Sequence, residues 1–272
     1  MKSKHVISHV FIVFLILVFM YPFIYMVSSS FKSLNEIFSC GLKILPEDFT
    51  TENYERVFET LDVAQYLKNT FCIALIAMVA KTITSVFAAY SLVFMDFKWK
   101  NAIFYFFTLT MFVPFSVIML PNYLTVHKMG LLNSIIGVTL PQLADAMGIF
   151  RIRQAMKTVP KSLVEAARID KCPHFKAMTR IVVPLVKPAV VAMAIFFFIN
   201  SWNEYFWPLL ILKKQNTWTI TLAMQQFISG ESGSAWGSSM ALATIATLVP
   251  LILYLVFQRF IISTFMSSGI KE

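Results

Sequence analysis

The sequence predicts an all-α polytopic membrane protein with about six transmembrane helices, and three observations support that prediction. Of the 272 residues, 58% are hydrophobic and only 14% are charged, whereas a soluble domain carries about 25% charged residues. The mean hydropathy is +0.71. Apolar runs also recur along the chain, each near the ~20 residues that a helix needs to cross a bilayer. We therefore treat residues 1–272 as a single transmembrane domain.

The first expected span covers residues 6–27 and follows a charged N-terminal stretch. That stretch is similar to the start of a signal peptide. The apolar run is longer than a signal peptide's and lacks a small-residue cleavage site, so we expect an uncleaved helix. Pro22 inside it is tolerated because neighbouring helices satisfy the freed backbone groups. Residues 28–68 are polar and acidic, and we expect an ordered extracellular loop with a short helix near residues 53–59.

Five further spans follow from the apolar runs, and prolines interrupt several of them. The runs cover residues 69–94, 102–126, 134–150, 181–212 and 239–265. Pro114 and Pro121 break the run at 102–126, Pro141 lies in the next run, and Pro250 lies in the last. The connections are a basic loop at 96–101, a turn at 127–133 with Gly130 as a helix C-cap, a charged segment at 151–180 and a polar extracellular loop at 213–238.

The distribution of Lys and Arg assigns the sides of the membrane. Of the 23 Lys and Arg residues, 15 fall on the side that holds both termini and residues 151–180, 7 fall on the other side, and Lys81 lies inside a span. Since cytoplasmic loops carry the excess of positive charge, we expect both termini and the charged segment in the cytoplasm. Topology explains the net charge of +9, so we expect no nucleic-acid partner.

Residues 160–188 form the most charged and most proline-punctuated part of the chain. Ser162 and Glu165 have the spacing of a capping box, which predicts a helix from Leu163 to Asp170. Leu163, Ala166 and Ala167 would give that helix a small apolar face that another protein can approach closely. Pro173 predicts a break and the start of a second helix. The alternative is an ordinary amphipathic loop that lies on anionic membrane lipid.

Motifs along nearly the whole chain resemble those of a known family. They are Leu120-Pro121, Gly130-Leu131-Leu132, Phe150-Arg151, Pro160, Glu165-Ala166-Ala167 with Asp170 three residues on, Ile181-Val182-Val183-Pro184, Trp202-Asn203-Glu204 and Trp207-Pro208-Leu209. The segment around Glu165 resembles the EAA loop of permease subunits of importer-type ABC transporters. The wider set looks like the maltose-permease-G-like branch of sugar importers.

The resemblance implies a binding-protein-dependent ABC importer of the bacterial inner membrane. In that family the first helix of the EAA loop is a coupling helix that sits in a cleft of a separate ATPase subunit. The resemblance implies that the ATPase subunit docks on the residues that match this helix, which are Ser162, Leu163, Glu165, Ala166, Ala167, Asp170 and Lys171. Its partners would be a homologous second permease, two ABC ATPase subunits that hold ATP-Mg, an extracellular solute-binding protein and membrane lipid.

Lys171 departs from the family pattern, which has glycine after the aspartate. A glycine there suits a left-handed residue at a helix end, and a side chain in that conformation costs roughly 1 kcal/mol. Two outcomes follow: the turn is built differently, or the cost is accepted and partly offset by a positive charge at the helix C-terminus.

Polar residues inside the spans are candidates for the substrate pathway. They are Lys81, Gln142, Asp145, Asn200, Asn203 and Glu204. A charge in a bilayer is costly and faces the bundle or a cavity, so Lys81 attracts an anionic group of the solute, pairs with Glu204 or Asp145, or shows that the span is shifted along the sequence. The amides and Glu204, beside Trp202, Tyr205 and Trp207, either bind a sugar or hold helices together.

Several other chemistries have no support in the sequence. The chain lacks GxxxxGK[ST] and HExxH, and its cysteines and histidines have no metal-ligand spacing. We therefore expect no catalytic residues, no metal and no cofactor bound by this chain, with energy supplied by another protein. A phosphorylated solute such as glycerol phosphate is the alternative to a sugar. An ion-coupled secondary transporter and a non-transporting scaffold are the more distant alternatives.

Overall fold

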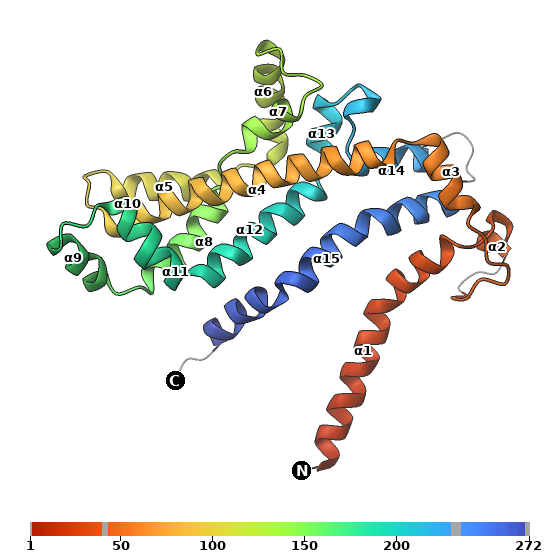
Figure 1. Ribbon diagram of the computed structural model, residues 1–272, viewed down its shortest axis with the longest axis horizontal. Helices are drawn as coiled ribbons and strands as arrows, with labels where there is room; N and C mark the ends of the chain where they lie inside the picture. Colours follow the sequence, from red (N-terminus) through yellow and green to blue (C-terminus); the bar gives the residue numbers. More distant parts are fainter. Residues whose placement is uncertain (1, 40–42, 230–234, 270–272) are drawn as a thin grey trace. The chain divides into compact units, whose positions relative to one another are not determined.

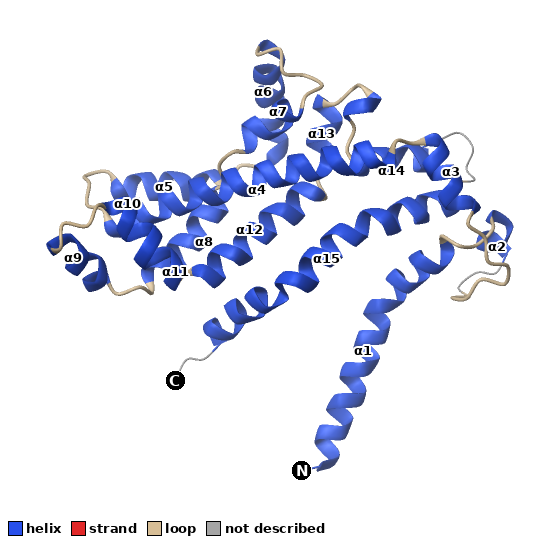
Figure 2. Ribbon diagram, in the orientation of Figure 1, coloured by secondary structure: helices blue, strands red, loops and turns tan. Residues whose placement is uncertain are grey.

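The computed structural model describes residues 2–39, 43–229 and 235–269, and within those ranges the chain is helical without a β-strand (Figures 1 and 2). Helices account for 79% of it, which confirms the all-α prediction. The first elements are α1 (Lys2–Ser29), α2 (Leu34–Ser39), α3 (Glu52–Thr60), α4 (Val63–Phe94), α5 (Lys100–Thr110) and α6 (Phe115–Lys128). The middle elements are α7 (Ile135–Thr139), η1 (Leu140–Gln142), α8 (Ala146–Lys157), α9 (Lys161–Ile169), α10 (His174–Ala177), the π turn η2 (Met178–Val182), α11 (Val183–Leu185) and α12 (Lys187–Trp202). The last elements are α13 (Phe206–Ile211), η3 (Gln215–Thr217), α14 (Ile220–Ser229) and α15 (Trp236–Gly269).

Straight helices account for only half of the expected spans. Among the described residues, the helices long and apolar enough to cross a membrane are Ser8–Ser29, Val63–Phe94 and Trp236–Phe260. The other spans are bent pairs: Lys100–Thr110 with Phe115–Lys128 at 98°, Ile135–Gln142 with Ala146–Lys157 at 49°, and His174–Leu185 with Lys187–Trp202 at 87°. The chain therefore has up to 6 spans if each pair counts as one, in the predicted order.

The bends have local causes, and they correct two of the expected spans. Pro114 has an extended backbone with ψ of 140° and directly precedes α6, as a proline that blocks continuation of α5 should. Pro121 lies inside α6, so the predicted break at that residue is wrong. The run at 181–212 is not one helix, because the chain turns at Val186 before α12, which has Pro188 in its first turn. That helix ends at Trp202, and α13 follows after residues 203–205.

The structure divides into two compact units, which we describe separately. The first comprises the described residues of Met1–Leu67 and Thr219–Val249, and the second those of Lys68–Trp218 and Pro250–Glu272. In the first unit, α3 confirms the short helix expected near residues 53–59. The Asn53 amide donates to the carbonyls of Ser30 at 3.1 Å and Lys32 at 2.8 Å. A Cβ atom added to Gly237 would lie only 2.2 Å from the side-chain oxygen of Asn53, so the two residues are in close contact. Asn53 thus joins the end of α1, α3 and the start of α15.

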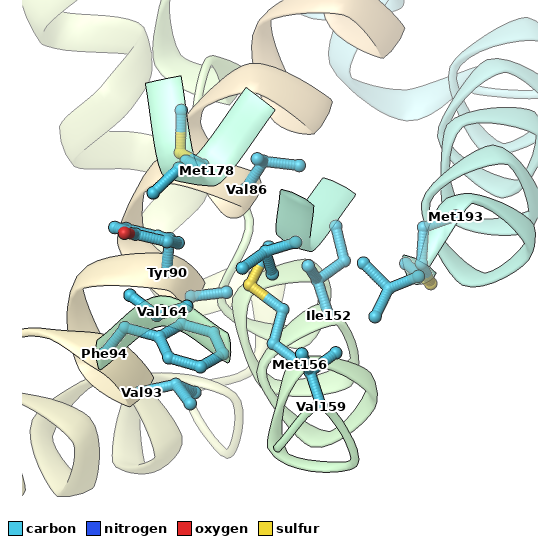
Figure 3. Close-up of a cluster of buried hydrophobic side chains, with 14 of the residues drawn as sticks. Val86, Tyr90, Val93, Phe94, Ile152, Met156, Val159, Val164, Met178 and Met193 are labelled. Carbon is cyan, nitrogen blue, oxygen red and sulfur yellow. The ribbon is translucent and has the colours of Figure 1, made fainter. Parts of the chain in front are cut away.

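The core of the second unit forms around α4, α8, α9, η2 and α12. Its buried side chains are Val86, Ala89, Tyr90, Val93, Phe94, Ile152, Met156, Val159, Val164, Ala177, Met178, Val182, Val186, Met193 and Phe197 (Figure 3). Gly148 lets the helices meet closely, because a Cβ there would lie 2.3 Å from Phe197 Cζ and 2.7 Å from Ser85 Oγ. The core therefore depends on the absence of a side chain at the start of α8.

The two ends of α4 carry different connections. Its N-terminal end is tied to the segment before α14, because the Asn69 amide donates to the carbonyls of Asn216 at 3.1 Å and Trp218 at 3.0 Å. Its C-terminal end carries Tyr90 and Phe94, which pack with Val164 of α9, and α9 and α10 lie at that end in Figure 1.

Candidate functional site

The helix expected in the charged segment is present, but it begins differently. Helix α9 runs from Lys161 to Ile169, preceded by Pro160 with φ of −57° and ψ of 126°, and no side chain caps it. The Leu163 amide donates to the Pro160 carbonyl at 3.2 Å, so Ser162 lies inside the first turn. The predicted capping box of Ser162 and Glu165 is therefore wrong. Proline with its fixed φ leads directly into the helix, two residues earlier than the box would place the start.

Helix α9 presents one side to its own protein and the other outward. The outward side chains are those of Ser162, Leu163, Glu165, Ala166, Ile169 and Asp170. Val164 and Ala167 are buried, so the expected face of Leu163, Ala166 and Ala167 is wrong for Ala167. Ile169, which the sequence reasoning missed, is 83% exposed. The sequence did contain a signal for this orientation. Val164 and Ala167 are three residues apart and share one helix face, which leaves Ile169 on another face.

The end of α9 shows how the chain accommodates Lys171. Its φ is +57°, the left-handed conformation that favours glycine. The Lys171 amide donates to the Arg168 carbonyl at 3.0 Å and the Cys172 amide to the Ala167 carbonyl at 2.9 Å, which is a Schellman motif. Of the two outcomes considered, the family-like turn with an accepted cost is the one observed. Asp170 is the C-cap residue.

Contacts with α4 hold the segment after α9 in place. Tyr90 Oη lies 3.2 Å from His174 Nδ1, and the two rings meet edge to face at 6.1 Å. The Phe87 and Phe175 rings stack at 6.2 Å. Pro173 precedes α10, so the predicted break and second helix are confirmed. Helix α9 is thus followed directly by a segment, α10, that packs against the transmembrane helix α4.

The region expected as a loop at 151–180 is partly helical, because α8 continues to Lys157. Arg153 is buried there, with its guanidinium carbon 3.7 Å from the centre of the Phe104 ring. Stacking a cation on an aromatic face compensates part of the cost of burial. The loop that was expected from residue 151 therefore begins after residue 157.

Three of the polar pathway candidates form a side-chain bridge. Lys81 Nζ donates to Gln142 Oε1 at 3.3 Å, and Gln142 Nε2 donates to Glu204 Oε2 at 2.8 Å. Lys81 Nζ also lies 5.8 Å from the centre of the Phe197 ring. The expected direct pairing of Lys81 with Glu204 or Asp145 is replaced by this amide-bridged arrangement. All three side chains are half-buried.

The bridge lies at breaks in two helical segments. Gln142 ends η1, and Glu204 follows the end of α12. Thr84 of α4 donates its hydroxyl to the Leu143 carbonyl at 3.0 Å, which holds the first break against α4. Asp145 caps α8 by accepting from the Gly148 amide at 2.7 Å, a stabilising place for a carboxylate at a helix N-terminus.

The remaining candidates differ in exposure. Asn200 and Asn203 are exposed. Trp202 and Trp207 are buried: the first stacks on Phe198 at 5.8 Å, and the second donates its indole N–H to the Val138 carbonyl at 2.9 Å. The two tryptophans therefore serve the helix packing, and the amides and Glu204 are the groups at this place with access to a ligand.

Comparison with known proteins places this architecture. Residues 81–265 match the family described as binding-protein-dependent transport system inner membrane component. The chain belongs to this family. The match includes both α9 and the Lys81–Gln142–Glu204 bridge, and it makes the chain a component of an inner-membrane transport system with several membrane-spanning helices.

Relatives of this inner-membrane component are named as permeases for glycerol 3-phosphate or for oligosaccharides. The chain is 30% identical over 266 residues to the sn-glycerol-3-phosphate transport system permease protein UgpE of Agrobacterium fabrum, covering 94% of each protein. It is 30% identical over 264 residues to the arabinooligosaccharides transport system permease protein AraQ of Bacillus subtilis, covering 96% of this chain and 94% of that one. A chain in the crystal structure of a bacterial ABC transporter that imports the acidic polysaccharide alginate has the same fold, with a TM-score of 0.83 at 22% identity over 95% of this chain and 96% of that one.

Proposed function

We propose that this chain is the membrane-spanning permease subunit of an ATP-driven ABC importer that moves a sugar or oligosaccharide into the cytoplasm. The relatives are named as permeases for sn-glycerol-3-phosphate and for arabinooligosaccharides, and the solved structure of the same fold belongs to an importer of a polysaccharide. Import through this subunit would alternate access to a path lined by the polar residues of its broken helices.

The outward face of α9 is the observation that carries this proposal. Leu163 is 43% exposed and Ile169 is 83% exposed, and between them Glu165 and Ala166 face outward as well. Exposed aliphatic side chains beside a charge mark an interaction surface. On our proposal this face sits in a cleft of the ATPase subunit, and the anchoring of α10 to α4 transmits ATPase closure to the transmembrane helices.

The proposal assigns the partners by side. Two ABC ATPase subunits with ATP-Mg bind in the cytoplasm, one of them against α9, and both termini lie on that side. A homologous second permease completes the path within the lipid bilayer. An extracellular solute-binding protein docks on residues 28–68 and 213–238. Residues 40–42 and 230–234 of those loops lie outside the described part of the chain.

The docking claim is tested with Glu165→Lys and Ala166→Arg in the complete transporter. Both change exposed side chains, so the fold should persist while ATPase co-purification and uptake are lost. Glu59→Lys on α3 makes the same charge change at an exposed position and should retain the ATPase. If both α9 variants keep uptake and co-purify the ATPase, the docking assignment is wrong.

Two alternative functions are tested with the same transporter. A phosphorylated solute is the second candidate, because Lys81 of α4 places a cation beside Gln142 at a break in a neighbouring span, and relatives are named as permeases for sn-glycerol-3-phosphate. An ion-coupled secondary transporter would take up solute with this chain alone in liposomes under an ion gradient. Uptake that needs ATP and the ATPase subunits excludes that mechanism.

A further inference from the structure

We infer that the Lys81–Gln142–Glu204 bridge is the place where the permease holds an uncharged, polyhydroxyl part of its solute, and that Gln142 keeps this place when no solute is bound. This inference rests on the proposed import function and goes further by choosing between a neutral and an anionic solute.

The position of the bridge suits a transport site. Lys81 lies in the interior of the 32-residue helix α4, roughly 27 Å from its first residue at 1.5 Å per residue. Gln142 and Glu204 stand at the ends of η1 and α12, where helical hydrogen bonding stops. Interrupted helices within the membrane are tolerated where they are buried in protein or line a cavity, and transporters build their substrate sites from them.

Exposure of the polar groups points to an aqueous path on this side. Lys81, Gln142 and Glu204 are half-buried, and Asn200 and Asn203 are exposed. Ionised and amide groups in a membrane span face a water-filled cavity or other protein rather than lipid. This face therefore has side chains that can exchange one hydrogen-bond partner for another.

The charges at the bridge cancel. The Lys81 ammonium and the Glu204 carboxyl group lie on either side of the neutral Gln142 amide, each within hydrogen-bond distance of it. The further carboxylate in this region, Asp145, is engaged as the cap of α8. A phosphate or carboxylate entering here would approach Lys81 only by also approaching Glu204, so the attraction and the repulsion offset each other.

The hydrogen-bond pattern of Gln142 is that of a sugar diol. Its oxygen accepts from Lys81 and its nitrogen donates to Glu204. A hydroxyl group is both donor and acceptor, so neighbouring hydroxyls of a sugar can accept from the ammonium and donate to the carboxylate. Rotation of Gln142 away from the bridge would exchange two hydrogen bonds for two equivalent ones. A fully ionised carboxylate or phosphate group has only acceptors, so the group itself cannot donate to Glu204.

The test measures solute binding to the complex of permease and ATPase subunits, isolated through a tag on this chain without the solute-binding protein and placed in nanodiscs. The neutral probes are arabinotriose, maltotriose and raffinose, and the anionic probes are glycerol 3-phosphate and a mannuronate trisaccharide. Equilibrium dialysis with labelled probes should show binding of at least one neutral probe and weaker binding of both anionic ones. Tighter binding of an anionic probe, or binding of no neutral probe, overturns the inference.

Variants assign the binding to the bridge. Glu204→Gln and Lys81→Met should each weaken the neutral probe at least about tenfold, since each removes a hydrogen bond to a charged group. Glu204→Gln leaves a net positive charge and should also improve glycerol 3-phosphate binding, whereas Lys81→Met should not. The double variant removes both charges and keeps the local charge balance, so it guards against misfolding of the single variants and should still lose the neutral probe.

The controls separate this inference from the proposed function. Gln215→Leu changes an exposed amide in η3 and should bind as the unmodified complex does, whereas Gln142→Leu should alter neutral-probe affinity. Unchanged affinity in Lys81→Met and Glu204→Gln overturns the inference. ATPase co-purification is measured on the same samples. If the ATPase is absent from the complex, the importer assignment is refuted and the binding result still stands. If the ATPase is present but the bridge variants bind solute as the unmodified complex does, only the inference is refuted.

Discussion

Glycine at position 171 should make the turn after α9 more stable than alanine does. Lys171 has a φ of +57°, and the left-handed conformation costs a residue with a side chain roughly 1–2 kcal/mol. Glycine avoids that cost but loses about 0.5–1 kcal/mol more backbone entropy on folding. The charge of Lys171 near the helix C-terminus is worth about 0.3–1 kcal/mol. We therefore compare Lys171→Gly with Lys171→Ala, because both lose that charge equally.

The difference between these two variants should be about 0.5–1 kcal/mol in favour of glycine, by the left-handed cost less the entropy term. The reporter is the Cys172 amide, which donates to the Ala167 carbonyl at 2.9 Å. Its hydrogen exchange through local opening should be roughly two to five times slower in the glycine variant. Hydrogen-exchange mass spectrometry of the complex in nanodiscs, corrected for intrinsic rates, measures this. Equal or faster exchange with glycine would refute the assignment of strain to Lys171.

Further predictions concern packing in each unit. Gly148→Val should destabilise the chain by about 1–3 kcal/mol through overpacking against Phe197, read as a lower thermal midpoint in detergent, and an unchanged midpoint would contradict the close approach. Asn53→Ala removes two hydrogen bonds to backbone carbonyls and should cost about 1–3 kcal/mol, seen as faster exchange in α3 but not in α9. Trp207→Phe loses the bond to Val138 and should cost about 1 kcal/mol, with a smaller thermal shift than for Gly148→Val.

Local properties of the sequence determined the fold class and several boundaries. Apolar runs of membrane-spanning length predicted the spans, because hydropathy is a property of each segment by itself. Gly130 has a φ of +69° after α6, as its predicted role as a C-cap requires. Pro173 directly precedes α10, and of the two outcomes considered at Lys171 the left-handed turn is the one observed. Each of these outcomes depends on the backbone preference of one or two residues.

Long-range packing decided what local preferences left open. Ser162 and Glu165 have capping-box spacing, yet α9 begins after Pro160 and turns Val164 and Ala167 into the core. That orientation depends on contacts with α4, η2 and α8, which are distant in sequence.

The polar candidates show the same division between sequence and structure. Lys81, Gln142 and Glu204 were each recognisable as costly groups within apolar runs. Their bridge exists because bends at residues 143–145 and 203–205 bring three separate elements together. The sequence by itself determined which segments enter the membrane and which residues are polar there, since both follow from local composition. Only the tertiary structure decided which of those residues meet and which side of α9 is free, because those follow from the packing of helices far apart in the chain.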